Sequence, residues 1–381
     1  MPTRPMRVCI AGTFDPEFHR NRHLLRLLDL AGIETRVLHV RLWGVREDRV
    51  VRRGRLRLAF RAAGALPRVA WRFLRGERPD VLLIAYPGQL DAPLLGPLAR
   101  WRSVPVVFDP FISLFDTVVE DRGLAGPRSA LGRLLAFLDR RACRAADLLL
   151  ADTPDHAERF SELTGVPRER FRVLPVGADD SLFRPRAVPP EPGSVLFYGT
   201  YIPLHGVHTI LAAAARLRDR PLRFKLIGAG QERARAEAFV REHRLAHVEL
   251  AEPVPLERLP DEIARSWLCL GIFGTSGKAS RVIPNKIFQC LAVGRPVLTG
   301  ETPAVTGAFA PDEVATVPPG DPEALAEAIA ALADDPARTE ALAAAGHARF
   351  RRDYRGEVLA GELDRHLREA AGAGRRARGL G

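Results

Sequence analysis

The lysines of this arginine-rich chain are concentrated in the segment KASRVIPNKIFQCLAVGRPVLTG, residues 278–300. The chain has only three lysines, and two of them, Lys278 and Lys286, lie here with Arg281 between them. Ammonium and guanidinium groups are common partners of phosphate oxygens. The segment therefore predicts a binding site for a diphosphate. The alternative is an ordinary solvated loop.

The same segment predicts the start of a helix. Pro284 followed by Asn285 fits a helix N-terminus with Asn285 as the N-cap, and backbone N–H groups at such a terminus favour anions. Gln289 lies one turn further on, so Asn285 and Gln289 can face the same ligand. Thr275 and Ser276 lie before the segment and add two hydroxyl donors.

Two glycine-containing loops follow predicted strands elsewhere in the chain. In GTFDPEFHRNRHLL, Gly12 and Thr13 allow a tight turn above a sheet, but the spacing is not that of a dinucleotide-binding motif. In GTYIPLHGVHTILAAA, His205 and Gly206 precede a predicted helix that starts near Val207. His205 and Gly206 are therefore candidates for contacting a phosphate. A simple strand-to-helix turn is the alternative in both places.

An acidic segment, VVFDPFISLFDTVVEDR, follows another buried strand and contains Asp109, Asp116 and Asp121. Asp109 stands at the carboxyl end of the strand, where a base or an anchor for an acceptor hydroxyl would lie. The spacing of the three carboxylates fits no metal cage, so no metal site is expected. Asp121 could equally cap a turn.

Short apolar runs alternate with helical patterns and must position these residues. Strands are predicted at 7–12, 34–40, 80–85, 104–109, 146–152, 170–177, 195–199, 223–228, 247–250, 268–273 and 296–300. Continuous Val/Ile/Leu strands between helices indicate parallel sheets covered on both faces. The expected fold class is α/β, with two doubly wound Rossmann-like domains facing a central cleft. Ligands of such sheets bind beyond the carboxyl ends of the strands and between domains.

The proline-rich segment RPRAVPPEPGS, residues 184–194, has no hydrophobic period and is the predicted interdomain linker. The expected division is a domain at 1–186, a second domain at 187–355, and a C-terminal helix with a disordered Arg/Gly tail at 356–381.

The composition is that of a globular protein of 381 residues with a net charge of +11. Four widely separated cysteines are expected to be reduced and buried. The absence of a secretory segment or a membrane span predicts a cytoplasmic protein. The basic stretch at 51–76 carries Phe60, Trp71 and Phe73 on an apolar face, which favours either peripheral contact with an anionic membrane on the cytoplasmic face or packing on a sheet. Dispersed arginine and few aromatic residues argue against nucleic acid as a partner.

Taken in order, several segments resemble the retaining glycosyltransferases of GT-B architecture, in family 4 of that class. The segments are GTYIPLHGVHTILAAA, FKLIGAGQE, VELAEPVPLERLP and IPNKIFQCLAVGRPVLTG, with VVFDPFISLFDTVVEDRG and ADLLLADTPDHAERF in the first half. The resemblance covers about residues 6–355. It implies transfer of a hexose or related sugar from a UDP-, GDP- or similar nucleotide-sugar, held mainly by the C-terminal domain. It also implies a glycan, lipid-linked or small-molecule acceptor on the N-terminal domain, retention of configuration, and no metal or other cofactor.

The resemblance also assigns roles to particular residues. It places the glycine-rich first loop at Gly12 and Thr13. Base recognition falls at Glu252, Pro253 and Val254.

The sequence departs from the family pattern at four positions. The usual pair of glutamates falls at Arg281 and Gln289, and the usual basic pair falls near Thr200 and His205. We therefore expect Arg281 and Lys286, with Lys278, to replace the missing cations, and Gln289 to hydrogen-bond a ribose. These departures also leave a rival reading, in which the chain is a catalytically impaired relative that binds nucleotide-sugars or acts as a scaffold.

Overall fold

The computed structural model describes residues 5–40, 55–121 and 123–376. Contacts divide the chain into two compact units, each with its own parallel sheet. The first unit comprises Met1–Val119, Gly123–Pro175 and Gly356–Gly381, and the second comprises Glu120–Arg122 and Val176–Arg355. Two six-stranded parallel sheets covered by helices confirm the predicted α/β, doubly wound architecture.

The first unit has the strand order β2-β1-β3-β4-β5-β6. Its strands are β1 (Arg7–Gly12), β2 (Glu34–His39), β3 (Val81–Ile84), β4 (Val106–Phe108), β5 (Leu148–Ala151) and β6 (Phe171–Val173). Its helices are α1 (His19–Leu30), α2 (Arg55–Arg75), α3 (Ala92–Trp101), the π-helix η2 (Asp116–Asp121), α4 (Ala130–Ala145), α5 (Pro154–Thr164), the 3-10 helix η3 (Arg168–Arg170) and α13 (Gly356–Arg376).

Alternate residues of the central strands enter two different cores. Leu82 and Ile84 of β3 pack with α2, α3, α4 and α5, whereas Val81 and Leu83 pack with α1 and α13. Side chains of a strand alternate between faces, so a strand buried on both faces reads as a continuous apolar run. This is why the strands could be located from the sequence.

The second unit has the strand order β12-β11-β10-β7-β8-β9. Its strands are β7 (Glu191–Tyr198), β8 (Arg223–Ile227), β9 (Val248–Ala251), β10 (Ser266–Leu270), β11 (Val297–Gly300) and β12 (Ala315–Val317). Its helices are η4 (Pro203–His205), α6 (Val207–Arg216), α7 (Arg233–Glu242), η5 (Leu256–Arg258), α8 (Leu259–Arg265), η6 (Ala279–Arg281), α9 (Asn285–Val293), α10 (Pro303–Ala308), α11 (Pro322–Asp334) and α12 (Pro336–Asp353). Helices α6, α7 and α11 share one core with the sheet, while α8, α9 and α12 contact one another and β7, β10 and β11.

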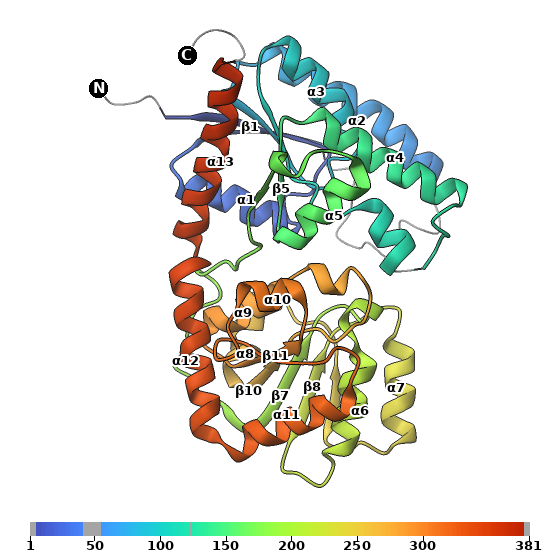
Figure 1. The fold of residues 1–381 in the computed structure, drawn as a ribbon, viewed down its shortest axis with the longest axis vertical. Helices are drawn as coiled ribbons and strands as arrows, with labels where there is room; N and C mark the ends of the chain where they lie inside the picture. The colour runs from blue at the N-terminus through green and yellow to red at the C-terminus, as the bar shows by residue number, and fades with distance from the viewer. Residues whose placement is uncertain (1–4, 41–54, 122, 377–381) are drawn as a thin grey trace. The chain divides into compact units, whose positions relative to one another are not determined.

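The last helix, α13, belongs to the first unit although it follows the second in the chain. Leu359, Leu363 and Leu367 recur every four residues and are buried against Leu24 and Leu28 of α1. Apolar residues at this spacing form one stripe of a helix, and here the stripe covers the first sheet (Figure 1). The first unit therefore contains both the first strand, β1, and the last helix, α13, of the described residues.

The predicted linker at 184–194 is partly a strand, because β7 begins at Glu191. All four cysteines are buried and unpaired. Within residues 5–40, 55–121 and 123–376, no helix is long and apolar enough to cross a membrane.

Candidate active site

Two loops of the second unit pack tightly together at the carboxyl ends of the neighbouring strands β7 and β10. Gly206 has φ +64°, and a Cβ there would lie 2.6 Å from the carbonyl carbon of Phe273. The amide of Phe273 donates to the carbonyl of His205 at 3.1 Å. Only glycine fits at position 206, since its conformation and its space both exclude a side chain. The close packing holds His205 in one place.

Lys286, on the first turn of α9, is buried beneath these loops, with 5% of the residue exposed. Its ammonium lies 3.8 Å from the centroid of the Phe197 ring and 3.4 Å from the carbonyl oxygen of Gly271. A Cβ at Gly199 would lie 3.1 Å from its Nζ atom. Burial lowers the pKa of Lys286 to about 7, and no carboxylate opposes that shift. The site therefore holds a cation that lacks a counter-charge among the described residues.

His205 is uncharged at neutral pH. Burial, together with the charges of Lys286 and Lys278, holds its pKa well below the usual range. Its Nδ1 atom faces the carbonyl oxygen of Thr200, and because a carbonyl only accepts, Nδ1 must carry the proton. Nε2 is then an acceptor, so His205 can receive a hydrogen bond from a hydroxyl group but cannot donate one to a phosphate.

Gln289 is oriented by a tyrosine of the neighbouring strand. The hydroxyl group of Tyr198 donates to Oε1 of Gln289 at 2.9 Å and also lies 3.4 Å from the carbonyl of Lys286. With its oxygen engaged, the Gln289 amide presents N–H donors. Tyr198 was not predicted as a site residue, because its position at the end of a buried strand does not distinguish it from the apolar residues before it.

The predicted N-cap was wrong. Pro284 occupies the N-cap position of α9 and makes no side-chain cap, and Asn285 is the first helical residue. The extended conformation that proline favours places the chain at the helix entrance, so the boundary moves by one residue. Asn285 remains half-buried on the first turn beside Lys286.

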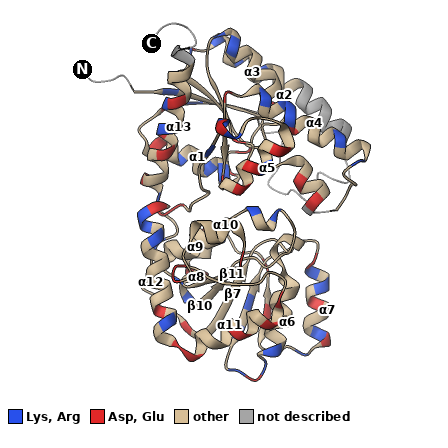
Figure 2. Ribbon diagram, viewed as in Figure 1, with Lys and Arg blue, Asp and Glu red and all other residues tan. Residues whose placement is uncertain are grey.

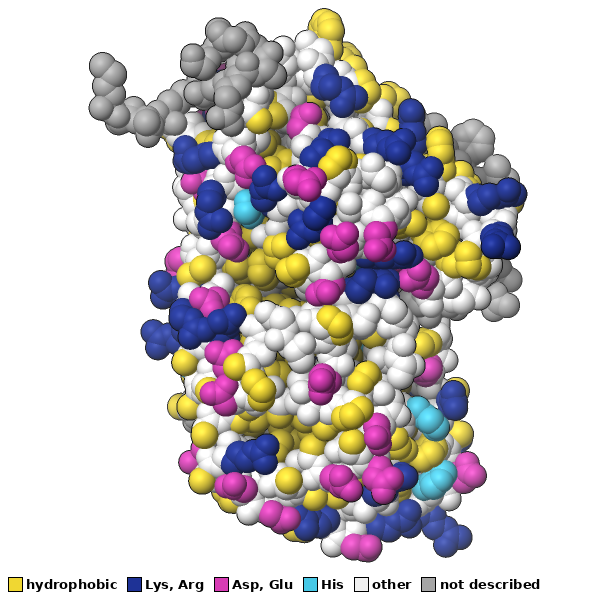
Figure 3. Space-filling model, in the orientation of Figure 1, with side chains coloured by type: hydrophobic (Ala, Val, Ile, Leu, Met, Phe, Trp, Pro, Cys, Tyr) yellow, Lys and Arg dark blue, Asp and Glu magenta, His cyan; other side chains and the backbone are white. Residues whose placement is uncertain are grey.

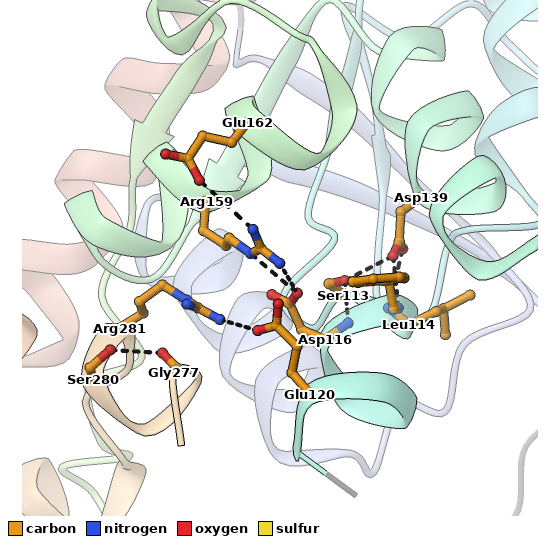
Figure 4. A network of polar contacts seen from close by, with 11 residues as sticks. Ser113, Leu114, Asp116, Glu120, Asp139, Arg159, Glu162, Gly277, Ser280 and Arg281 are labelled. Carbon is orange, nitrogen blue, oxygen red and sulfur yellow. Dashed lines mark hydrogen bonds and ion pairs between the residues drawn. The ribbon is translucent and has the colours of Figure 1, made fainter. Parts of the chain in front are cut away.

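The other residues of the basic loop have separate surroundings. Lys278 is buried and close enough to His205 to lower its pKa. The hydroxyl of Ser276 accepts from the amide of Ala279 at 3.3 Å, and Thr275 is exposed. Arg281 forms an ion pair with Glu120 at 2.8 Å (Figure 4). Glu120 lies near the end of η2, and its contacts place it in the second unit, unlike the start of that helix. Lys278 and Lys286 therefore place positive charge near His205. The charge of Arg281 is balanced by the carboxylate of Glu120.

In the first unit, the loop that follows β1 is held by the carboxylate of Asp91, a residue that was not among the predicted site residues. Asp91 accepts from the amide and the hydroxyl group of Thr13, at 3.0 and 2.9 Å, and burial raises its pKa to about 6. Gly12 has φ +147°, and a Cβ there would lie 3.2 Å from Cγ of Asp91. Asp91 is the N-cap residue of α3, which has a proline in its first turn, yet its side chain makes no cap hydrogen bond with that helix.

Asp109 is fully buried rather than presented to solvent. Its Oδ2 atom accepts from Nε of Arg20 at 2.7 Å, and Arg20 also donates to the carbonyls of Leu174 and Pro175. Burial raises the pKa of Asp109, and the Arg20 guanidinium opposes this shift. The Oδ1 atom makes no hydrogen bond within the described residues. A role as acceptor base stays a prediction.

Two further buried acids, Asp116 of this segment and Asp139 of α4, bind groups of the first unit (Figure 4). Asp116 is buried and accepts from Arg159 at 3.1 Å. Asp139 of α4 accepts from the hydroxyl of Ser113 at 2.8 Å and from two backbone amides, and burial raises its pKa to about 6. The side chain of Asp121 lies outside the described residues.

The proposed base-recognition segment follows β9, an edge strand of the second sheet. Val254 is half-buried, and Glu252 is exposed and pairs with Arg233 at 3.4 Å. In the first unit, a cavity of about 600 Å³ is lined by residues that precede β4, β5 and β6 and by α13. It therefore lies at the amino ends of the strands, opposite the edge where Thr13 and Asp109 lie.

Both halves of the chain match family models of glycosyltransferases. Residues 19–177 match the family model described as a glycosyl transferase 4-like domain, and residues 207–363 match one described as glycosyl transferase-like. The two matches together span most of the chain. The chain belongs to the glycosyltransferases of this family, and its fold is GT-B.

Individual relatives are distant. D-inositol 3-phosphate glycosyltransferase 1 of Catenulispora acidiphila is 28% identical over 319 residues, which cover 74% of this chain and 71% of that protein. Three other curated glycosyltransferases match over only 32%, 48% and 49% of their own lengths.

Solved structures match nearly the whole fold. Sucrose-phosphate synthase of Thermosynechococcus elongatus has a TM-score of 0.75 and 18% identity, with 97% of this chain and all of that chain covered. HepE of Anabaena, in complex with UDP-glucose, has a TM-score of 0.69 and 14% identity, with 96% of this chain and all of that chain covered. At such identities these similarities concern the fold.

Proposed function

We propose that this chain transfers a sugar from a nucleotide-diphosphate sugar to an acceptor, with retention of configuration and without a metal ion. The observation that carries the proposal is Lys286, a buried ammonium with no carboxylate partner among the described residues. Burying an uncompensated cation is costly. The cost is accounted for if a negatively charged ligand, absent from the free protein, supplies the counter-charge.

A diphosphate is the ligand that best fits this position. Its leaving group gains negative charge as the glycosidic bond breaks, and fixed donors around it stabilise that transition state. Lys286 would supply a charge-assisted hydrogen bond, and the first-turn amides of α9, which lack intrahelical acceptors, would supply further donors. Lys278 adds a second positive charge. These groups do the work that a divalent cation does in other transferases, which is why we propose metal independence.

The other residues of the site are assigned by their hydrogen-bonding capacity. Neutral His205 would accept a hydrogen bond from a sugar hydroxyl through Nε2, rather than contact the diphosphate. Gln289, with its oxygen held by Tyr198, would donate its amide N–H to a ribose hydroxyl. Thr200, Gly206 and Asn285 would contribute backbone and side-chain contacts at the same loops, and Val254 would contact the base.

The nature of the donor is supported by the complexes formed by fold neighbours. HepE of Anabaena was crystallised with UDP and with UDP-glucose. We propose a UDP-, GDP- or similar nucleotide-sugar as the donor here, and a glycan, lipid-linked or small-molecule acceptor bound by the first unit.

A catalytically impaired relative that only binds nucleotide-sugars is the second candidate. Two observations favour it: Gln289 stands where the family has a carboxylate, and Arg281 is already paired with Glu120. This candidate predicts nucleotide binding without turnover.

The test compares two lysine substitutions in the purified chain. Donor consumption is followed by mass spectrometry against a panel of UDP- and GDP-sugars, and UDP binding by thermal shift. Lys286→Met should lower turnover about 100-fold or more, the usual cost of removing one group that stabilises a developing anion. Lys225→Met is the matched control, since Lys225 forms a partly exposed ion pair with Glu262 at 2.7 Å.

The possible outcomes separate the candidates. Binding of a nucleotide with no turnover for any donor favours the impaired relative. Equal turnover in wild type and Lys286→Met rules out the role of Lys286. The anomeric configuration of the product, read by NMR, decides retention.

A further inference from the structure

Helices α2, α3 and α4 form a layer on one face of the first sheet. Neighbouring helices of the layer contact one another, and their inner sides share a single core with the strands. Phe73 of α2, Leu95 of α3 and Cys143 of α4 are buried there. We call the opposite, solvent-facing side of these three helices the outer face.

The outer face is basic and lacks acidic side chains. Its exposed arginines are Arg68, Arg72, Arg75, Arg100, Arg133, Arg140, Arg141 and Arg144. The three helices contain a single acidic residue, Asp139, which is buried and bonded to the Ser113 loop. Figure 2 shows arginines on all three helices. Like charges gathered without counter-charges repel one another, so this surface attracts an anionic partner.

The same face exposes large apolar side chains. Trp101 is 78% exposed, Trp71 55%, Phe137 54%, Leu134 51% and Leu94 37%. Among the side chains that the structure describes, in residues 5–40, 64–120 and 123–373, all of the exposed large apolar ones lie in the first unit. Figure 3 shows hydrophobic and arginine side chains interleaved over this part of the first unit. Isolated exposed apolar residues are normal, but five on one basic layer call for a partner.

Helix α13, on the other face of the same sheet, shows a different pattern. It carries Glu357, Glu362, Asp364 and Glu369 among its arginines, and Arg368 pairs with Asp364 at 2.7 Å. The outer face therefore differs from the rest of the arginine-rich chain, because it combines exposed aromatic rings with arginines that form no ion pair among the described residues.

We propose that the outer face binds the surface of an anionic lipid bilayer. Arginines near such a surface are attracted by the negative headgroups, and tryptophan prefers the boundary between headgroups and hydrocarbon. Leu94, Leu134 and Phe137 would enter that boundary, as the apolar side of an interfacial helix does. Nucleic acid is the less suitable anion, because bases could stack on the exposed aromatic rings but would leave Leu94 and Leu134 in water. Helix α2, which lies within the basic stretch 51–76, is then one of three helices that make the contact.

Sedimentation of the full chain with lipid vesicles tests the proposal without nucleotide or acceptor. The chain should pellet with phosphatidylcholine vesicles that contain about one third phosphatidylglycerol, and not with pure phosphatidylcholine. Binding should weaken as salt rises, because added ions screen the headgroup charge. Tryptophan emission should shift to shorter wavelength on binding.

Two variants and one control locate the contact. Arg72→Glu with Arg140→Glu should weaken vesicle binding about tenfold or more, and Trp101→Ser with Phe137→Ser should weaken it and reduce the emission shift. Arg241→Glu with Arg351→Glu makes the same change in net charge on exposed arginines of the second unit and should bind like wild type. Circular dichroism checks that each variant is folded.

Three outcomes would overturn the proposal. The first is no pelleting with the anionic vesicles. The second is an equal loss of binding in the second-unit control, which would indicate net charge without a defined face. The third is tight binding of a single-stranded oligonucleotide that the same outer-face variants abolish, with no vesicle binding.

Discussion

The two units have the same sheet architecture but differ in the partner of a buried cation. At the carboxyl edge of the first sheet, Arg20 is fully buried and forms a 2.7 Å ion pair with Asp109. At the carboxyl edge of the second sheet, Lys286 is buried over the ring of Phe197, and no carboxylate of the described residues lies beside it. One cation is neutralised by the fold, and the other is not.

The contrast separates structural polar groups from ligand-binding ones. A buried ion pair is satisfied by its own chain and tells little about a ligand, although removing one partner is severely destabilising. A buried ammonium without a counter-charge reduces stability, and such costs are typical of binding sites. Changes to the two cations should therefore have opposite effects on folding.

The largest effect is expected from Arg20→Met in the first unit. The substitution leaves Asp109 buried without its partner, and the expected loss is about 3 to 5 kcal/mol. Urea unfolding should show the midpoint of the first unit falling while that of the second stays constant.

The matched control for this substitution is Arg368→Met, which removes a 2.7 Å ion pair on the same unit whose arginine side chain is 57% exposed. Exposed pairs contribute less than about 1 kcal/mol. Similar losses in the two variants would show that the Arg20–Asp109 pair is not special.

The next effect is a gain of stability from Lys286→Met at pH 6.5. The folded-state pKa of Lys286 is lowered from 10.5 to about 7, so between those values the unfolded chain holds a proton that the folded chain does not. Wild-type stability therefore rises with pH over this window, and the cost of the lysine is fully present below about pH 7. We expect a gain of about 2 kcal/mol, less than the whole shift implies, because the contact with the Phe197 ring is lost.

Unfolding midpoints at pH 6.5 and pH 9.5 check this prediction. The advantage of Lys286→Met should shrink toward the higher pH, and Lys225→Met should show no comparable trend. A variant that is less stable than wild type at pH 6.5 would mean that the fold itself needs the ammonium.

Much of the architecture could be predicted from the sequence, because strands buried on both faces leave unbroken apolar runs. The strand at 7–12 has the predicted bounds, and a helix begins after Pro284 as predicted, with its N-cap one residue earlier. The helix is delimited by Pro284 and by Gly294, whose φ of +82° suits a C-terminal glycine. The unit to which α13 belongs could not be predicted, because the spacing of Leu359, Leu363 and Leu367 indicates a helix but not the sheet that it covers.

The candidate site was predictable in its residue types but not in its charge states. The sequence shows Lys286 near a helix start, but the burial that lowers its pKa comes from β7 and its loop, almost 90 positions earlier. The lowered pKa of His205 likewise comes first from its burial and then from the charges of Lys286 and Lys278, which lie more than 70 positions later in the chain. Asp91 and Tyr198 could not be predicted because each makes its contact far along the chain, Asp91 with Thr13 and Tyr198 with Gln289.

The smallest effect distinguishes positioning from simple packing. Tyr198→Phe and Tyr201→Phe each remove one buried hydroxyl, which donates to Gln289 in the first case and to the carbonyl of Leu226 in the second, both at 2.9 Å. Each should cost about 1 kcal/mol of stability. Only Tyr198→Phe should also weaken UDP binding in calorimetry, by about three- to tenfold, because a Gln289 amide released from Tyr198 no longer presents its N–H groups in one direction. If both variants bind UDP as wild type does, Gln289 does not contact the nucleotide, and the second unit's site then depends on its buried cation and helix amides.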